Sequence, residues 1–404
     1  MIEEHLVIPS APAKVLRVNT CVAFAVTQSL YDNYEFVAQL AAASYCPGNS
    51  LNSDNTGKLV CPKSNNCPRV EAAKTSIVAG IKNSPITDVT GFVALDLTNN
   101  FTVISFQGTE SAKQTKADLN FNLKAISHVC ADCTTHTGFW QSWEEARPQV
   151  SKAIDELRAK YPDHKLIVTG HSLGGAIATL AAAEMRSSGT PVDLYTYGAP
   201  RVGNQKLADY IQRPKEKLGE NFRVTHYNDP VPRLPPPAMG FAHYTPEIYL
   251  AGKNNVKVSL SDIALLDASS VSKGTEQHTI VDVEAHRWYF NKISACYSAN
   301  VQTSNSASAD LATGWAPAVI TLLGNNSGLV LKGGTSATSG MAAGVAAGFF
   351  GSMGASATNA LLSLLPGGFL VQPFVPSPAT AAAGSAGLVA GLGSIFGSLG
   401  SWNL

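Results

Sequence analysis

Charge is scarce in this sequence of 404 residues. Charged side chains make up 14% of it, and 29 basic residues balance 29 acidic ones, so the formal net charge is zero. A protein that binds nucleic acid neutralises phosphates with a basic surface. The composition therefore argues against a nucleic-acid partner. The length allows one large domain or two ordinary ones.

The last quarter of the chain lacks charge almost completely. Between residues 301 and 404 the charged side chains are Asp310 and Lys332, and this stretch holds 18 of the 34 glycines. It lacks the periodicity of a core helix and the charge of a usual linker, and Gly, Ser, Asn and Pro interrupt it too often for a confident membrane span. We therefore expect a folded domain at residues 29–300 and a Gly/Ala/Ser-rich, low-complexity tail of unknown role at 301–404. The mildly apolar run at 387–396 leaves a lipid anchor at the cell surface as an alternative.

The first 28 residues form an N-terminal extension or an imperfect signal segment. Signal peptides have a basic start and an apolar run of about seven residues or more, whereas this start is acidic and its apolar run covers only residues 21–26. Ala23-Phe-Ala25 nevertheless resembles a cleavage site. Cleavage after Ala25 would remove Cys21 and leave six of the seven cysteines. A misplaced start or an uncleaved extension stays equally open.

A serine flanked by glycines stands at residues 170–175, in the order Gly-His-Ser-Leu-Gly-Gly. The apolar run at 166–168 predicts a buried strand, and the Ala- and Leu-rich run at 176–185 predicts a helix. Glycines two residues before and after Ser172 permit the close backbone approach of a sharp strand-to-helix turn. This is the nucleophile elbow pattern, in which the serine is exposed at the N-terminus of a helix.

A serine nucleophile needs a histidine base and a carboxylate that orients it. Asp229 follows the strand predicted at 222–227, and ligand-facing residues lie just past such strand ends. Three histidines come later in the chain, and spacing alone favours His286 only slightly over His243 and His278. The acid and base are expected in the order Asp then His after the serine.

Nine stretches of the chain, spread from residue 41 to residue 290, resemble the fungal class 3 (filamentous-fungal) triacylglycerol lipases, in the family's order and at near-family separations. They read "AAASYC", "VTGFVALD", "ISFQGTE", "DLNFNLKAI", "CADCTTHTGFWQSW", "VTGHSLGGA", "YGAPRVGN", "VTHYNDPVPRLPP" and "AHRWYF". The resemblance implies an α/β-hydrolase fold, with a mostly parallel central sheet flanked by helices. It places Ser172, Asp229 and His286 at the triad positions and makes Thr109 and Leu173 the oxyanion hole. His243 matches a family histidine that is not the base.

Four metal-ligand side chains lie within nine residues, and they are His128, Cys130, Cys133 and His136. Structural zinc sites usually separate two ligand pairs more widely, so we expect no metal here. The resemblance instead implies disulfides, which pair Cys130 with Cys133, Cys61 with Cys67, and Cys46 with Cys296. Three disulfides indicate an oxidising compartment, so we expect a secreted protein. Glycosylation sequons at Asn100 and Asn325 agree with secretion but are common by chance.

The sequence therefore predicts a secreted serine carboxylic-ester hydrolase, foremost a triacylglycerol lipase that works through an acyl-enzyme without a cofactor. Its expected partner is an acylglycerol or other carboxylic ester, with a lipid–water interface as a further partner, and we expect a monomer. A feruloyl esterase of the same fold is the enzymatic alternative. The non-enzymatic alternative is a non-catalytic lipase-like binding protein, and the filled triad positions argue against it.

The expected lid departs from the lipases that the chain resembles. In that family a short helix with an apolar inner face covers the site and opens on lipid. The matching stretch here, residues 111–118, contains no Trp, Leu, Ile, Val or Phe. Because full burial of a large apolar side chain is worth about 1.5–3 kcal/mol, such a lid gains little from lipid. We expect weak interfacial activation.

Overall fold

The computed structural model describes residues 26–50, 57–61, 65–82, 84–212, 218–278, 280–296 and 330–331. Residues 1–25 of the predicted N-terminal segment, the sequon at Asn325 and nearly all of the predicted tail lie outside these residues. The chain divides into two compact units, Met1–Gln277 with Glu284–Ala312, and His278–Val283 with Thr313–Leu404. In the second unit the short strands β11 (Ile280–Val281) and β14 (Val330–Leu331) pair in parallel. The boundary near residue 300 stays a prediction.

The first unit is built on a sheet of eight described strands in the order β1-β2-β3-β6-β7-β8-β9-β10. Four of the seven neighbouring pairs, from β3 through β9, are parallel, and the pairs at both edges are antiparallel. The expected mostly parallel central sheet is confirmed. The strands are β1 (Ser76–Ile81), β2 (Gly91–Asp96), β3 (Phe101–Phe106), β6 (Lys165–His171), β7 (Asp193–Tyr197), β8 (Asn221–His226), β9 (Glu247–Leu250) and β10 (Ile263–Leu266).

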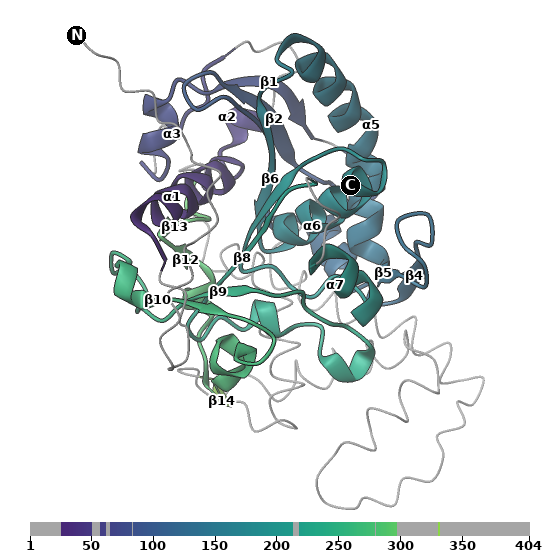
Figure 1. Cartoon of the computed structure of the whole chain (residues 1–404), viewed down its shortest axis with the longest axis vertical. Coiled ribbons are helices and arrows are strands. Elements are labelled where there is room, and N and C mark those ends of the chain that lie inside the picture. The colour runs from purple at the N-terminus through teal and green to yellow at the C-terminus, as the bar shows by residue number, and fades with distance from the viewer. Residues whose placement is uncertain are drawn as a thin grey trace, which may run out of the picture. The chain divides into compact units, whose positions relative to one another are not determined.

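Helices cover both faces of this sheet, as Figure 1 shows with α1 on one side and α5 to α7 on the other. The helices are α1 (Gln28–Ala43), α2 (Pro47–Ser50), α3 (Pro68–Ala72), α4 (Ala112–Asp118), α5 (Thr137–Lys160), α6 (Leu173–Ser187), α7 (Gln205–Gln212) and α8 (Val283–His286). Because both faces of the central strands are buried, their side chains are apolar at consecutive positions instead of alternating with polar ones. This explains the apolar run that marked β6 in the sequence.

Consecutive residues of the central strands contribute to two different cores. Ile104 of β3 and Val168 of β6 pack with α5, α6 and α7, whereas Val103 and Ile167, one residue earlier in each strand, pack with α1. This follows from the alternation of side chains along a strand. The strands are thereby fixed from both sides, and so are the loops at their carboxyl ends.

Smaller elements fill the connections. They are the pairs β4 (Leu123–Ala125) with β5 (Thr134–His136) and β12 (Trp288–Tyr289) with β13 (Asn291–Lys292), and the 3-10 helices η1 (Val231–Arg233), η2 (Pro237–Met239), η3 (Leu260–Asp262), η4 (Val271–Lys273) and η5 (Thr275–Gln277). Among the described residues, no helix is long and apolar enough to cross a membrane.

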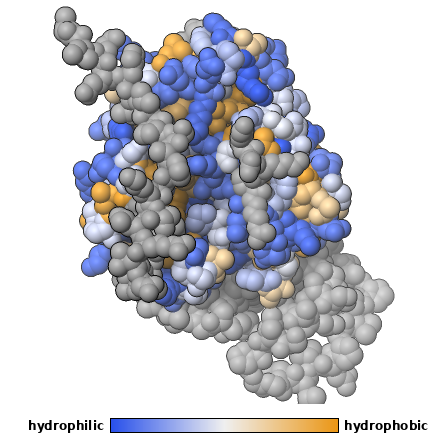
Figure 2. Space-filling view, in the orientation of Figure 1, coloured by the Kyte–Doolittle hydropathy of each residue, from blue (hydrophilic) through white to orange (hydrophobic). Residues whose placement is uncertain are grey.

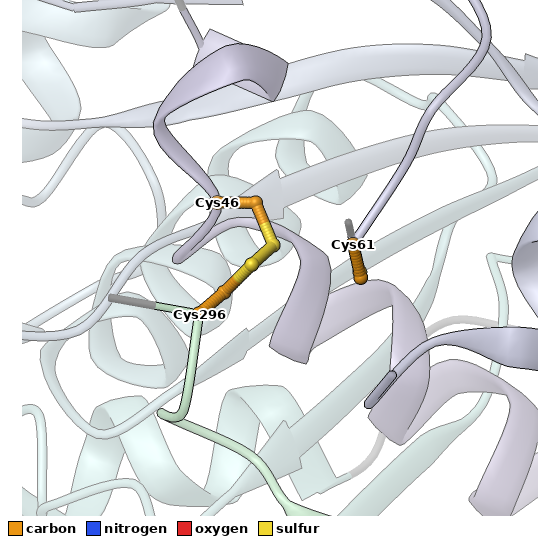
Figure 3. A group of neighbouring side chains, drawn as sticks. All are labelled: Cys46, Cys61 and Cys296. Atoms are coloured by element: carbon orange, nitrogen blue, oxygen red, sulfur yellow. A yellow bond between two sulfur atoms is a disulfide. The ribbon is translucent and has the colours of Figure 1, made fainter. Parts of the chain in front are cut away.

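Three disulfides join the pairs that the family resemblance implied: Cys46 with Cys296, Cys61 with Cys67, and Cys130 with Cys133. The first spans 250 residues of sequence. Figure 3 shows this bond with Cys61 beside it, and the sulfur atoms of the three residues lie within 4.8 Å of one another. Because these sulfurs are already in disulfides, the group offers no thiolates to a metal ion.

Candidate active site

The elbow predicted at residues 170–175 is present between β6 and α6. Ser172 follows the strand directly and has φ 58° and ψ −128°, a conformation that L residues rarely adopt and that costs energy where it occurs. A Cβ on Gly170 would lie 2.3 Å from atoms of Gly174, and a Cβ on Gly174 would lie 2.1 Å from the carbonyl oxygen of Phe106. The two glycines therefore let α6 pack directly against β6 and the end of β3.

Asp229 and His286 meet beyond the carboxyl end of β8. His286 Nδ1 lies 2.9 Å from Asp229 Oδ2 and 3.1 Å from Oδ1, and both residues are buried. The contact with Asp229 therefore supports His286 among the histidines left open by spacing. His243 instead places Nε2 2.6 Å from the carbonyl oxygen of Pro232.

The Asp229 carboxylate accepts two further hydrogen bonds. The backbone N–H of Val231 donates to Oδ1 over 2.8 Å, and the buried hydroxyl of Tyr289 donates to Oδ2. Hydrogen bonds to the ionised form stabilise a buried carboxylate. Burial and the neighbouring Asp229 charge raise the pKa of Tyr289 well above its usual value, so this phenol keeps the proton that it donates.

His171, the residue before Ser172, connects the elbow to the Asp229–His286 pair. Its Nε2 lies 2.8 Å from the backbone carbonyl of His286, and its Nδ1 lies 2.6 Å from the hydroxyl of Tyr45. Burial lowers the pKa of His171 well below its usual value, so the ring is neutral. A neutral ring can donate from Nε2 to the carbonyl and accept at Nδ1 from the phenol. The imidazoles of His171 and His286 lie 4.5 Å apart between ring centroids.

The two predicted oxyanion residues follow the ends of two neighbouring strands, β6 and β3. Leu173 is the first residue of α6, where the backbone N–H groups have no partner within the helix. Thr109 follows β3, which pairs with β6 in parallel. Its hydroxyl donates to Asp118 Oδ2 over 2.7 Å. Because the hydroxyl proton of Thr109 is engaged in this bond, the backbone N–H is the donor that this residue could offer to an oxyanion.

The segment that matches the family lid forms the seven-residue helix α4, which begins after Ser111 with a capping box to Gln114. Its buried side chains include Gln114, Ala117 and Asp118. Burial raises the pKa of the Asp118 carboxyl well above its usual value, and the Thr109 hydroxyl opposes this only in part. The inner face of α4 is therefore largely polar, as the sequence of this segment indicated.

His136 joins the end of α4 to the start of α5. Its Nδ1 accepts the N–H of Phe139 over 3.3 Å, and its Nε2 lies 3.1 Å from the carbonyl oxygen of Asp118. Burial lowers the pKa of His136 to about 3. Both ring nitrogens of His136 are thus engaged, and Cys130 and Cys133 are joined in the disulfide that the resemblance implied.

Hydrophobic side chains are sparse on the visible surface. Figure 2 shows hydrophilic residues over much of the described face, with hydrophobic ones in separate groups. Among the residues that the structure describes, the exposed large hydrophobic ones are Ile86, Leu97, Leu119, Leu123, Val256 and Leu260. Of these, Leu119 directly follows α4 and Leu123 begins β4. Two apolar side chains therefore stand exposed just beyond the C-terminal end of the lid segment.

Sequence reasoning missed the polar residues that support the site. Tyr289 lies inside the family stretch "AHRWYF" and Tyr45 inside "AAASYC". Both residues therefore belong to stretches that carry the resemblance, but the sequence assigned neither of them a role. The elbow pattern leaves the residue before the serine unspecified and so assigns no role to His171. A signal was available for Gln114, because Ser111 and Gln114 have the spacing of a capping box.

A parallel sheet with a serine elbow and a buried Asp–His pair past later strand ends is the arrangement of the α/β-hydrolases. The family model described as "Lipase (class 3)" matches residues 103–239. The secreted mono- and diacylglycerol lipase A of Penicillium cyclopium is 41% identical over 274 residues, which cover 67% of this chain and 88% of that protein. The secreted mono- and diacylglycerol lipase 1 of Fusarium solani is 36% identical over 275 residues, covering 68% and 80%.

A comparison with solved structures also finds a fungal lipase. The crystal structure of a mono- and diacylglycerol lipase from Aspergillus oryzae matches with a TM-score of 0.62 and 38% identity, over 67% of this chain and 100% of that one. The chain belongs to the class 3 lipase family. It is a carboxylic-ester hydrolase of the α/β-hydrolase fold, as its sequence predicted.

Proposed function

We propose that this lipase cleaves acylglycerols with Ser172 as nucleophile, His286 as base and Asp229 as the orienting carboxylate. The observation that carries the proposal is the buried contact of His286 with Asp229 over 2.9 Å, tied to the strained elbow through His171. A serine in such an elbow presents its hydroxyl at a helix N-terminus. The N–H groups of Thr109 and Leu173 complete the site as oxyanion donors.

The reaction follows from these roles. His286 Nε2 takes the proton of the Ser172 hydroxyl as its oxygen bonds to the ester carbonyl carbon, and the resulting oxyanion accepts the two backbone N–H groups. His286 then gives the proton to the departing alcohol, which leaves an acyl-enzyme that water hydrolyses by the same steps. Asp229 stabilises the imidazolium that forms. Removing one oxyanion donor typically costs about 2.7–4 kcal/mol of transition-state stabilisation.

The substrate class rests on the relatives. Two of them carry the words mono- and diacylglycerol lipase in their names, which favours partial acylglycerols over the triacylglycerols expected first from the sequence. Rates of fatty-acid release from mono-, di- and triacylglycerols of one acyl chain would test this. Release from triacylglycerol at least as fast as from diacylglycerol would contradict it. Methyl ferulate in the same assay tests the feruloyl esterase alternative.

Secretion is proposed from the same relatives, which are named as secreted, and from the three disulfides. Such bonds persist in oxidising compartments. We further propose that the enzyme works as a monomer at a lipid–water interface. A lipid anchor at the cell surface remains the alternative for location.

An organophosphonate ester that labels activated serines tests the site directly. We expect one label per chain at Ser172, located by mass spectrometry of the peptide. Ser172→Ala, Asp229→Ala and His286→Ala should each lower kcat by about 10⁴-fold or more, and the losses should not add because the three act as a unit.

Two outcomes would reject parts of this proposal. An active Ser172→Ala enzyme would remove the mechanism altogether. A fully active His286→Ala enzyme would return the base to His243 or His278. Because all three side chains are buried, the folding of each variant is checked by its melting temperature.

A further inference from the structure

The backbone that follows β3, residues 107–111, carries Thr109 and is called the oxyanion loop below. Hydrogen bonds of several side chains hold it. Gln107 Nε2 donates to Glu110 Oε2 over 2.6 Å, and the Thr109 hydroxyl donates to Asp118. The Ser111 hydroxyl accepts the N–H of Gln114 over 3.3 Å. The side chain of Gln114 differs from these, because it accepts backbone N–H groups of the loop itself.

Gln114 is bonded at both ends of its amide. Its Oε1 accepts the backbone N–H of Glu110 over 2.6 Å and that of Ser111 over 2.9 Å. Its Nε2 donates to the carbonyl oxygen of Asp88 over 3.0 Å. The residue is only 2% exposed. One buried amide therefore fixes two consecutive peptide groups immediately after Thr109.

Asp88, which accepts the hydrogen bond of Gln114 Nε2, belongs to a segment that is itself held by hydrogen bonds. Residues 84–88 are hydrogen-bonded to Glu145 of α5. Its carboxylate accepts the N–H groups of Ile86 and Thr87, each over 2.9 Å. It also accepts the hydroxyls of Ser84 and Thr87. Gln114 thus connects the oxyanion loop to a segment fixed on the long helix of the core.

We propose that Gln114 is a positioning residue that aims the Thr109 N–H at the oxyanion. The inference rests on the proposed role of Thr109. The direction of a backbone N–H is set by the dihedral angles around it, and holding Glu110 and Ser111 restricts those angles on the C-terminal side of Thr109. Displacements of about 1 Å at a reacting site can cost on the order of 10²-fold in rate.

The two ends of the amide can be separated by mutation. Gln114→Glu keeps an oxygen for the two N–H groups, because capping boxes accept Glu or Gln at this position, but it loses the donor to Asp88. Gln114→Ala loses both contacts. Gln39 supplies a matched control, since it is also buried and its Oε1 accepts the backbone N–H of Arg69 over 2.8 Å on a different part of the fold.

The experiment measures kcat and KM on p-nitrophenyl butyrate, and the Ki of an alkyl trifluoromethyl ketone that forms a tetrahedral adduct with the serine. Active sites are counted by phosphonate labelling at long times, so that kcat refers to folded, competent enzyme. For Gln114→Ala we expect kcat to fall by about ten- to a hundredfold, KM to change by less than about threefold, and Ki to rise in parallel with the fall in kcat. Gln114→Glu should recover kcat to within about threefold of the wild type.

The controls separate this role from a merely structural one. Gln39→Ala should lower the melting temperature without changing kcat per labelled site. An unchanged kcat in Gln114→Ala would overturn the proposal, and so would an equal loss in Gln114→Glu, which would assign the effect to the Asp88 contact. If wild-type enzyme fails to label at Ser172, the proposed function fails instead, and the two failures are distinguishable.

Discussion

Leu173 and Thr109, the two proposed oxyanion donors, are supported in opposite ways. Leu173 begins α6, in which 12 of 15 residues are buried and whose apolar side chains pack in one of the two cores. Thr109 stands before the seven-residue helix α4, whose contacts with the loop include hydrogen bonds of Gln114 and Asp118. One donor is positioned by close packing, and the other by a few polar groups.

This difference predicts how mutations near Leu173 on the α6 side and near Thr109 on the α4 side should affect the enzyme. A close-packed core resists change until atoms overlap, and then a whole helix must move. A hydrogen-bonded loop can lose one bond and shift locally, while a donor or acceptor left unpaired in the interior costs roughly 1–3 kcal/mol. Changes on the α6 side should therefore affect stability and activity together. Changes on the α4 side should affect activity or pH dependence more selectively.

The largest effect is expected from Gly174→Ala on the packed side. The added Cβ would lie 2.1 Å from the carbonyl oxygen of Phe106, so α6 must move away from β3. We expect the melting temperature to fall by about 5–12 °C, from an overpacking cost of about 3 kcal/mol. kcat should fall by about 10²-fold as the elbow shifts. Gly48→Ala is the control, because within the described part of the chain its added Cβ meets no atom within 4 Å apart from its chain neighbours and its own helix backbone.

A smaller effect is expected from Asp118→Asn on the α4 side, and it should depend on pH. The raised pKa of Asp118 means that the fold favours the neutral carboxyl. This contribution is fully present at low pH and is lost as pH rises through the folded-state pKa. The amide of the variant cannot ionise, so the wild-type melting temperature should fall relative to that of Asp118→Asn between about pH 5 and about pH 9, by about 3 °C or more. A constant difference would mean that Asp118 is ionised throughout.

The smallest effect is expected at the lipid–water interface. Because the inner face of α4 is largely polar, we expect activity on monomeric short-chain esters and a rise of less than about tenfold when tributyrin passes its solubility limit. A larger rise would mean that apolar side chains also act on the α4 side, and the contrast with the α6 side would be smaller. Leu119 and Leu123, 38% and 41% exposed, would then be the residues to test, and Leu119→Ser should reduce the rise.

The central part of the fold was predictable because burial leaves a clear pattern. Residues 166–168 marked β6 and 176–185 marked α6, although the helix begins earlier, at Leu173, and ends at Ser187. Gly174 and Gly175 look unfavourable for a helix, since glycine costs about 1 kcal/mol there. They are nevertheless helical, and at Gly174 close approach to β3 leaves no room for a side chain. The start of α6 therefore depends on close packing against β3, which a local sequence pattern does not show.

The supporting polar residues could not be predicted in the same way. Spacing left His243, His278 and His286 open as the base, and the choice came from the family resemblance. Asp118 is the last residue of the polar stretch 111–118, and nothing in that stretch indicates that it is buried against Thr109. Gln114 depends on Asp88, which lies 26 residues away in sequence. Burial of a polar side chain in a short helix is decided by such distant partners, and composition does not report them.

The Cys46–Cys296 bond makes the catalytic part of this chain a covalent ring. Ser172, Asp229 and His286 all lie between the two joined residues, as do α4 and the oxyanion loop. A single peptide-bond cut anywhere inside the ring opens it without releasing a fragment, because both ends of the cut chain remain linked through the two sulfurs. The protein can therefore be nicked in an exposed loop and still keep its proposed catalytic residues on one molecule.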